Sequence, residues 1–160
     1  SSDLSGSNSG VARKWQSSNL TEDGRKCGKT TGCYYNFKGS ANENSLLKQV
    51  VKLTNHQFNA GDVLSLTTDL KTTVAAPNLL ITLAVTEGET VKSTFLLDEP
   101  TLDWLTIAPI THTLCGAPTK IVVSFRNKTK NGVIRVDNVS LRLSEPVDTR
   151  ACRLALPPAP

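Results

Sequence analysis

One carboxylate stands among apolar residues near the end of the sequence, where its chemistry requires a partner. Asp137 follows Val136 and precedes Asn138 and Val139. A carboxylate flanked by apolar side chains must be neutralised or hydrogen-bonded, because an unpaired charge is costly away from water. A cation, backbone amides, or solvent at a sheet edge would each meet this need, and the sequence leaves all three open.

The cysteines are the second group of residues whose types and spacing suggest chemistry: Cys27, Cys33, Cys115 and Cys152. Their number is even and none forms a Cys-x-x-Cys pair, which argues against zinc and thioredoxin-like sites. We favour a Cys27–Cys33 disulfide, which closes a short loop, and a Cys115–Cys152 disulfide, which holds the C-terminal tail to the domain. The alternative is four reduced thiols in a cytosolic protein.

Groups suited to acid–base or nucleophilic catalysis are scarce. The two histidines, His56 and His112, have polar neighbours, and we expect both at the surface. The sequence has no Gly-x-Ser-x-Gly elbow and no Gly-rich phosphate loop. No motif places two carboxylates together as a glycosidase requires. We therefore expect a protein that is not an enzyme.

The elements that must position these residues follow a period of two. Apolar and polar residues alternate most clearly at 64–70, 79–85 and 121–125, as in half-buried strands. Further strands, separated by turn-forming residues, are expected at 13–18, 33–38, 46–53, 91–97, 103–110 and 133–143. About nine short strands without a helical pattern predict an all-β sandwich of two antiparallel sheets.

The last of these strands changes phase at the carboxylate. Ile134 and Val136 share one parity, whereas Val139 and Leu141 have the opposite one. Because side chains alternate along a strand, both pairs face the same side only if one extra residue is inserted between them. The sequence therefore predicts a β-bulge at residues 137–138.

Composition and charge narrow the class of protein. The chain has 160 residues, of which 38% are hydrophobic and 20% charged, as expected for one globular domain. The net charge of +4 is spread out, and the basic clusters at 25–29 and 126–130 lack the aromatics that stack on bases. We expect neither nucleic-acid binding nor membrane insertion, since no apolar run could cross a bilayer. The chain starts at Ser1 and contains no Met, so we expect a processed protein that is secreted or on the cell surface.

Three segments follow from composition: a Ser/Gly-rich arm at 1–12, the sandwich at 13–144 and a Pro-rich extended tail at 145–160. Neither end has a composition that orders on its own. Our main hypothesis is that neighbouring copies order them, with 1–13 or 146–156 completing the sheet of the next subunit. Such head-to-tail contacts would build a homopolymer, either an extracellular filament or a surface layer.

Several segments resemble a known family. Residues 136–141, Val-Asp-Asn-Val-Ser-Leu, resemble the closing strand of bacterial carbohydrate-binding-module-like jelly rolls, which are galactose-binding-like β-sandwiches. Residues 45–51 resemble the S-L-x-Q-x-V strand of these proteins, and residues 60–66 resemble their G-x-x-Y-x-L-S strand. The resemblance covers about residues 13–143 and implies that the sandwich is a jelly roll.

The resemblance also implies a structural Ca²⁺, which family members often hold. Asp137 stands at the position of the acidic ligand in their closing strand, although their usual N-terminal acidic motif is absent here. Ca²⁺ takes six or more oxygen ligands, and Glu43 and Asn44, in the loop before the 46–53 strand, would add two. Hydrogen bonds from turn amides to Asp137 are the alternative.

Sugar binding is the common activity of this family and uses exposed aromatic side chains. Trp15 and Trp104 match tryptophans that usually serve the core. This leaves Tyr34 or Tyr35, which must point to opposite faces of one strand, with Asn36 beside them, as glycan contacts. Polysaccharide binding by a module of a secreted multidomain protein is therefore the alternative to self-assembly.

Overall fold

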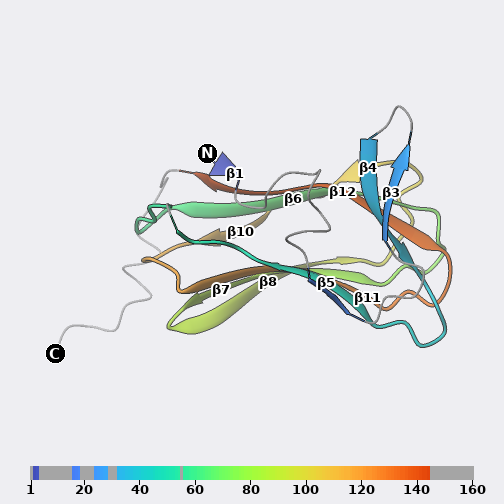
Figure 1. Cartoon of the computed structure of the whole chain (residues 1–160), viewed down its shortest axis with the longest axis horizontal. Coiled ribbons are helices and arrows are strands. Elements are labelled where there is room, and N and C mark those ends of the chain that lie inside the picture. The colour runs from blue at the N-terminus through green and yellow to red at the C-terminus, as the bar shows by residue number, and fades with distance from the viewer. Residues whose placement is uncertain (1, 4–15, 19–23, 29–31, 55, 145–160) are drawn as a thin grey trace.

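The computed structural model describes residues 2–3, 16–18, 24–28, 32–54 and 56–144, and these residues form two packed β-sheets (Figure 1). The strands are β1 (Ser2–Asp3), β2 (Gln16–Ser18), β3 (Gly24–Gly28), β4 (Gly32–Lys38), β5 (Ser45–Val50), β6 (Val63–Thr72), β7 (Leu79–Glu87), β8 (Glu89–Leu97), β9 (Leu105–Thr106), β10 (Ile110–Thr113), β11 (Lys120–Asn127) and β12 (Val133–Ser144). Among these residues there is no helix that could span a membrane.

The two sheets form separate layers in Figure 1. The seven-stranded sheet has the order β10-β6-β12-β4-β3, with β1 paired to β12 and β9 paired to β6. The five-stranded sheet has the order β2-β5-β11-β7-β8. Every pair of described strands is antiparallel. The predicted all-β sandwich of two antiparallel sheets is confirmed.

The core lies between the layers because alternate residues of the longest strands point inward. Leu64, Leu66 and Leu70 of β6 are fully buried and face Phe125 of β11 and its neighbours across the sandwich. Burial of each such side chain contributes about 1.5–3 kcal/mol. The phenyl rings of Phe37 and Phe125 lie 6.5 Å apart, so β4 and β11 share one core.

The predicted β-bulge is present in β12. Pairing of β12 with β6 shifts register between Asp137 and Ser140, and Asn138 has a positive φ of 50°. Asparagine tolerates this left-handed conformation better than most residues. After the bulge, Leu141 is again opposite Leu66 and buried. The single extra residue thus keeps both halves of the strand in the core.

The backbone conformation at the bulge leads to a stability prediction. Asn138→Val places a β-branched residue at positive φ, and we expect the free energy of unfolding to fall by about 1–2 kcal/mol. Asn138→Gly is the control, because glycine adopts this φ freely, although it loses the Nδ2 hydrogen bond to Asp69. Urea denaturation of both variants tests this. Equal stability of Asn138→Val and wild type would show that the strand does not need the bulge.

Two sequence-based expectations about strands were wrong. Arg25 and Lys26, which lie between the expected strands 13–18 and 33–38, belong to β3, which pairs with β4. This strand has no apolar alternation and is recognisable only through its partner. The strand expected at 103–110 is divided into β9 and β10, because Pro109 lacks an N–H and cannot continue the ladder.

The N-terminal strand bears on the hypothesis of strand exchange. Ser2 lies opposite Leu143 and Asp3 lies opposite Arg142, so β1 pairs with β12 of its own chain. The described part of the arm therefore completes the chain's own sheet rather than a neighbour's. The remainder of 1–12 and the tail at 145–160 lie outside the described residues.

The cysteines can be placed in part. The β3–β4 register sets Cys27 directly opposite Cys33, as the predicted pairing requires. Cys115 is disulfide-bonded, and none of the described cysteines is free. Cys152 lies outside the described residues, so its pairing with Cys115 stays a prediction.

Candidate functional site

The predicted metal ligand Asp137 lies at the bulge, opposite Asp69. Its Oδ1 accepts a hydrogen bond of 2.8 Å from the backbone N–H of Asn138. Asp69 accepts bonds from the side-chain amide of Asn138 and from the hydroxyl of Thr106. Both carboxylates therefore accept hydrogen bonds. The donor to Asp137 is a turn amide, which is the alternative to Ca²⁺ that the sequence left open.

The other two predicted ligands lie in the turn that follows β4. Glu43 is only 8% exposed; its Oε2 accepts a 2.9 Å bond from the Ser40 hydroxyl, and its Oε1 has no hydrogen-bond partner among the described residues. The Asn44 Oδ1 accepts a 2.8 Å bond from the Arg126 guanidinium. The Ser40 amide donates to the Thr129 carbonyl, so this turn lies against the β11–β12 connection.

The structure does not bring Asp137 together with Glu43 and Asn44. Val133, at the start of β12, lies opposite Lys38, and Asp137 is four residues further along, roughly 13 Å at the rise of a strand. Within the described ranges, no three acidic, histidine or cysteine residues are placed to hold a metal. The described residues therefore do not complete the predicted Ca²⁺ set, and the ion stays a prediction.

The predicted glycan contacts separate as strand alternation requires. Tyr35 is 7% exposed and packs on Phe37, with ring centroids 4.8 Å apart, so its place as a surface contact was wrong. Asn36, the next residue along β4, belongs to the outer face of the strand. Asn36 is partly exposed and lies opposite Arg135 of β12. The side chain of Tyr34 lies outside the described set.

Trp104, which we expected in the core, is 40% exposed. It lies just before the short strand β9, in which Leu105 pairs with Leu70 of β6. The preceding residue, Asp103, places its Oδ1 3.8 Å from the Nζ of Lys71. Trp104 is thus exposed beside β6, at the level of Lys71.

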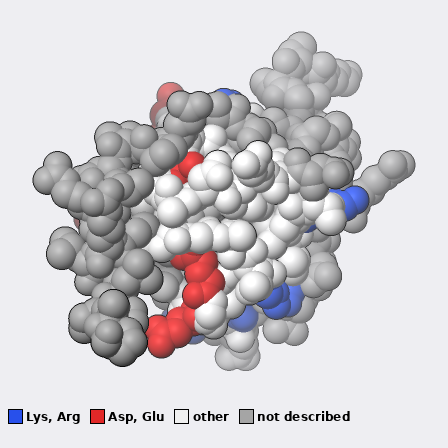
Figure 2. Space-filling view, turned by 90° about the vertical axis from the view of Figure 1, so that its left-hand side faces the viewer, with Lys and Arg blue, Asp and Glu red and all other residues white. Residues whose placement is uncertain are grey.

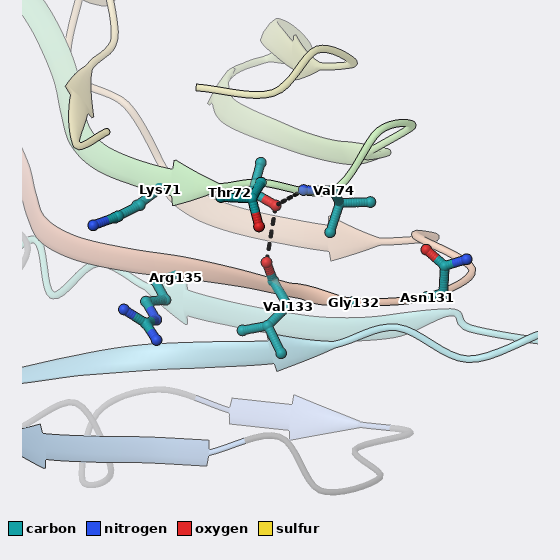
Figure 3. Close-up of a pocket in the computed structure, with 8 residues that line it drawn as sticks. Lys71, Thr72, Val74, Asn131, Gly132, Val133 and Arg135 are labelled. Atoms are coloured by element: carbon teal, nitrogen blue, oxygen red, sulfur yellow. Dashed lines mark hydrogen bonds between the residues drawn. The ribbon is translucent and has the colours of Figure 1, made fainter. Parts of the chain in front are cut away.

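Residues of three neighbouring strands lie in line with Trp104 across the outer face of the seven-stranded sheet. Lys71 of β6 lies directly opposite Arg135 of β12, and Arg135 lies directly opposite Asn36 of β4. The close-up shows the Lys71 and Arg135 side chains next to each other and pointing the same way (Figure 3). Together with Trp104, these residues form what we call the polar row: Trp104, Lys71, Arg135 and Asn36.

A hollow of about 410 Å³ adjoins the polar row. Its lining consists of Lys71, Thr72, Thr73, Val74, Asn131, Gly132, Val133 and Arg135. The Thr72 hydroxyl fixes its floor, because it donates to the Val133 carbonyl at 2.8 Å and accepts from the Val74 amide at 3.1 Å (Figure 3). At Gly132 any Cβ would overlap the Val74 side chain, so glycine allows the β11–β12 turn to close over this floor.

Charge is distributed unevenly between the two ends of the sandwich. The described residues that line the hollow include two cations and no carboxylate. At the opposite end, the tip of the β7–β8 hairpin carries Glu87 and Glu89. Figure 2 views that end and shows acidic atoms towards the lower left, with Lys and Arg atoms to their right. The hollow therefore presents two cations, with the Asp103 carboxylate 3.8 Å from the Lys71 ammonium.

Comparisons with known proteins identify the architecture. No protein-family model and no curated protein matches the chain in sequence. Solved structures do match: the CBM22-1 xylan-binding domain of Paenibacillus barcinonensis Xyn10C has a TM-score of 0.61 at 11% identity, over 88% of this chain and 92% of that one. TmCBM61 in complex with β-1,4-galactotriose has a TM-score of 0.56 at 17% identity, over 85% and 92%. The chain has the jelly-roll fold of carbohydrate-binding modules.

This carbohydrate-binding-module jelly roll also occurs inside larger chains. In the enzymatically active domain of tailspike protein 4 of bacteriophage CBA120, the match has a TM-score of 0.63 at 12% identity and covers 89% of this chain but 21% of that one. The resemblance read from the closing strand is confirmed. Identities this low establish the jelly-roll fold and no more, so any function must be argued from the chain's own residues.

Sequence reasoning missed three of the four residues in the polar row. Trp104 is followed by apolar Leu105 and was placed in the core, although Pro100 and Asp103 mark its surroundings as a loop. Lys71 and Arg135 are remote in sequence and become neighbours only through the β6–β12 register. The one available signal was that Arg135 stands between Ile134 and Val136 in the closing strand, so strand alternation points it outward.

Proposed function

We propose that this domain is a non-catalytic, extracellular module that binds a polysaccharide on the outer face of its seven-stranded sheet. The observation that carries the proposal is the exposed Trp104 at one end of the polar row. An indole offers a broad apolar face against which a sugar ring can pack. The disulfide at Cys115 supports an oxidising compartment.

The chemistry of the polar row suits sugar hydroxyls. Arginine supplies several N–H donors, lysine supplies three, and asparagine supplies both donors and an acceptor. From Trp104 to Asn36 the row crosses three strand spacings, roughly 14 Å. A site of that length fits an extended chain better than a single sugar. The xylan-binding domain and the galactotriose complex among the structural neighbours support a polysaccharide ligand.

Self-assembly, our main hypothesis from the sequence, has less support. β1 pairs with β12 of the same chain, and so it already occupies the edge that an exchanged strand would fill. The structural neighbours named above are carbohydrate-binding modules and a tailspike domain. We therefore prefer the alternative, polysaccharide binding.

Affinity electrophoresis tests the proposed function. The purified chain is run in native gels that each contain one soluble polysaccharide, including xylan, β-1,4-galactan and acidic polymers. We expect retardation by at least one polymer, without release of reducing ends after long incubation. Unchanged mobility in every gel would contradict the proposal. Concentration-dependent polymers in size-exclusion chromatography, without retardation, would restore the self-assembly hypothesis.

A further inference from the structure

We infer that the bound saccharide is anionic and that its carboxylate or sulfate group lies in the hollow beside Lys71 and Arg135. This inference rests on the proposed function and adds the chemical class of the ligand. The first reason is the pairing of the two cations. They are direct cross-strand partners on one face, and like charges in that position destabilise a sheet. A bound anion between them would remove this repulsion.

The second reason is that the ion pair of Lys71 is exposed to solvent. The Asp103 carboxylate approaches Lys71 at 3.8 Å, but its side chain is 86% exposed. Ion pairs with such exposure contribute little to stability. On the same face, the Asp69 and Asp137 carboxylates accept hydrogen bonds from Asn138 and its backbone amide. These bonds orient the two carboxylates toward the bulge, and neither residue lines the hollow.

The third reason is the build of the hollow itself. Thr72 holds the Val133 carbonyl and the Val74 amide, so the floor is fixed before a ligand arrives. Figure 3 shows Asn131 at the end of the hollow away from the two cations. A sugar ring over the valine floor would direct an anionic group toward Arg135, whose planar fork matches a carboxylate or sulfate. Its hydroxyls would face Asn131, whose amide both donates and accepts.

Matched polymers provide the test. Polygalacturonate is compared with its methyl-esterified form, and a sulfated galactan is compared with its desulfated form, by affinity electrophoresis and titration calorimetry. We expect each charged polymer that binds to bind about tenfold more tightly than its neutral partner. The preferred pair distinguishes carboxylate from sulfate. Added NaCl should weaken binding of the charged polymers.

Variants assign this selectivity to the hollow. The double variant Lys71→Gln, Arg135→Gln should lose the preference for the charged polymer and bind it about tenfold less tightly. Arg142→Gln is the matched control, because Arg142 is exposed on the same sheet but does not line the hollow. The double variant should melt within a few degrees of the wild-type temperature, because neither side chain belongs to the core. Arg135→Lys keeps the charge without the fork and should show a smaller loss.

The possible outcomes separate the two proposals. Equal or tighter binding of the neutral polymers overturns the inference and leaves the proposed function standing. Binding of the charged polymers that the double variant retains also overturns it, as does equal binding of polyglutamate, a polyanion without sugar rings. Failure to bind any polysaccharide removes the proposed function itself.

Discussion

Trp104→Ala is expected to weaken polysaccharide binding by at least about 30-fold, which corresponds to about 2 kcal/mol. The indole is the aromatic side chain of the polar row, and its 40% exposure gives a sugar ring access. Its removal deletes the stacking surface and leaves the hydrogen-bonding groups of the row in place. The melting temperature should change by only a few degrees, because the side chain is outside the core.

Titration calorimetry with the best-retained polysaccharide measures this effect. Leu105→Ala is the matched control: Leu105 is 44% exposed and adjacent, so it loses comparable apolar surface without an indole. We expect the control to bind within about twofold of wild type. Trp104→Phe should recover part of the affinity, because it restores a smaller ring. If Trp104→Ala binds as tightly as wild type, the ligand lies on another face of the sandwich.

Gly39→Ala is expected to cause the largest loss of stability, about 3 kcal/mol in the free energy of unfolding. A Cβ at this position would lie 2.6 Å from the Thr129 carbonyl oxygen and 2.7 Å from the Asn131 amide nitrogen. Both are backbone atoms and cannot rotate away. The β11–β12 turn must therefore move, and ligand affinity should fall with it, because Asn131 lines the hollow.

Alanine substitutions at two other glycines distinguish the effect of steric crowding from the effect of backbone strain. Gly116 has open space around its Cβ position, so Gly116→Ala should match or slightly exceed wild-type stability. Gly88 also has space but a φ of +85°, so Gly88→Ala should lose about 1 kcal/mol. Urea denaturation of the three variants gives the order. If Gly39→Ala has the same free energy of unfolding as Gly116→Ala, the β11–β12 turn can accommodate the added methyl group, and the crowding argument is wrong.

The sequence predicted most of the fold because burial leaves a periodic signature. Alternation identified β6, β7 and β11, and the change of parity around Asp137 located the bulge. It missed β1 and β3, since neither strand has an alternating apolar face and both depend on partners elsewhere in the chain. Such strands are defined by pairing, which a single sequence does not reveal.

The site was less accessible from the sequence than the fold. Alternation required Tyr34 and Tyr35 to face opposite ways, but only the packing of Tyr35 on Phe37 shows which one is buried. Trp104 was assigned to the core because it resembles a tryptophan that usually serves the core in this family. The turn that exposes it includes Leu102 at a φ of +62°, a conformation that leucine rarely adopts and that no sequence pattern predicted.

The bulge in β12 also determines which changes of length this strand can accept. Removing the one extra residue at 137–138 would restore strict alternation, and Leu141 and Leu143 would then face inward together with Ile134. Removing two residues would turn Leu141 and Leu143 outward, because the halves differ in parity and no bulge would compensate. A deletion of one residue here should therefore be tolerated better than a deletion of two. An alignment that places a single-residue gap at this point needs no compensating gap elsewhere in the same strand.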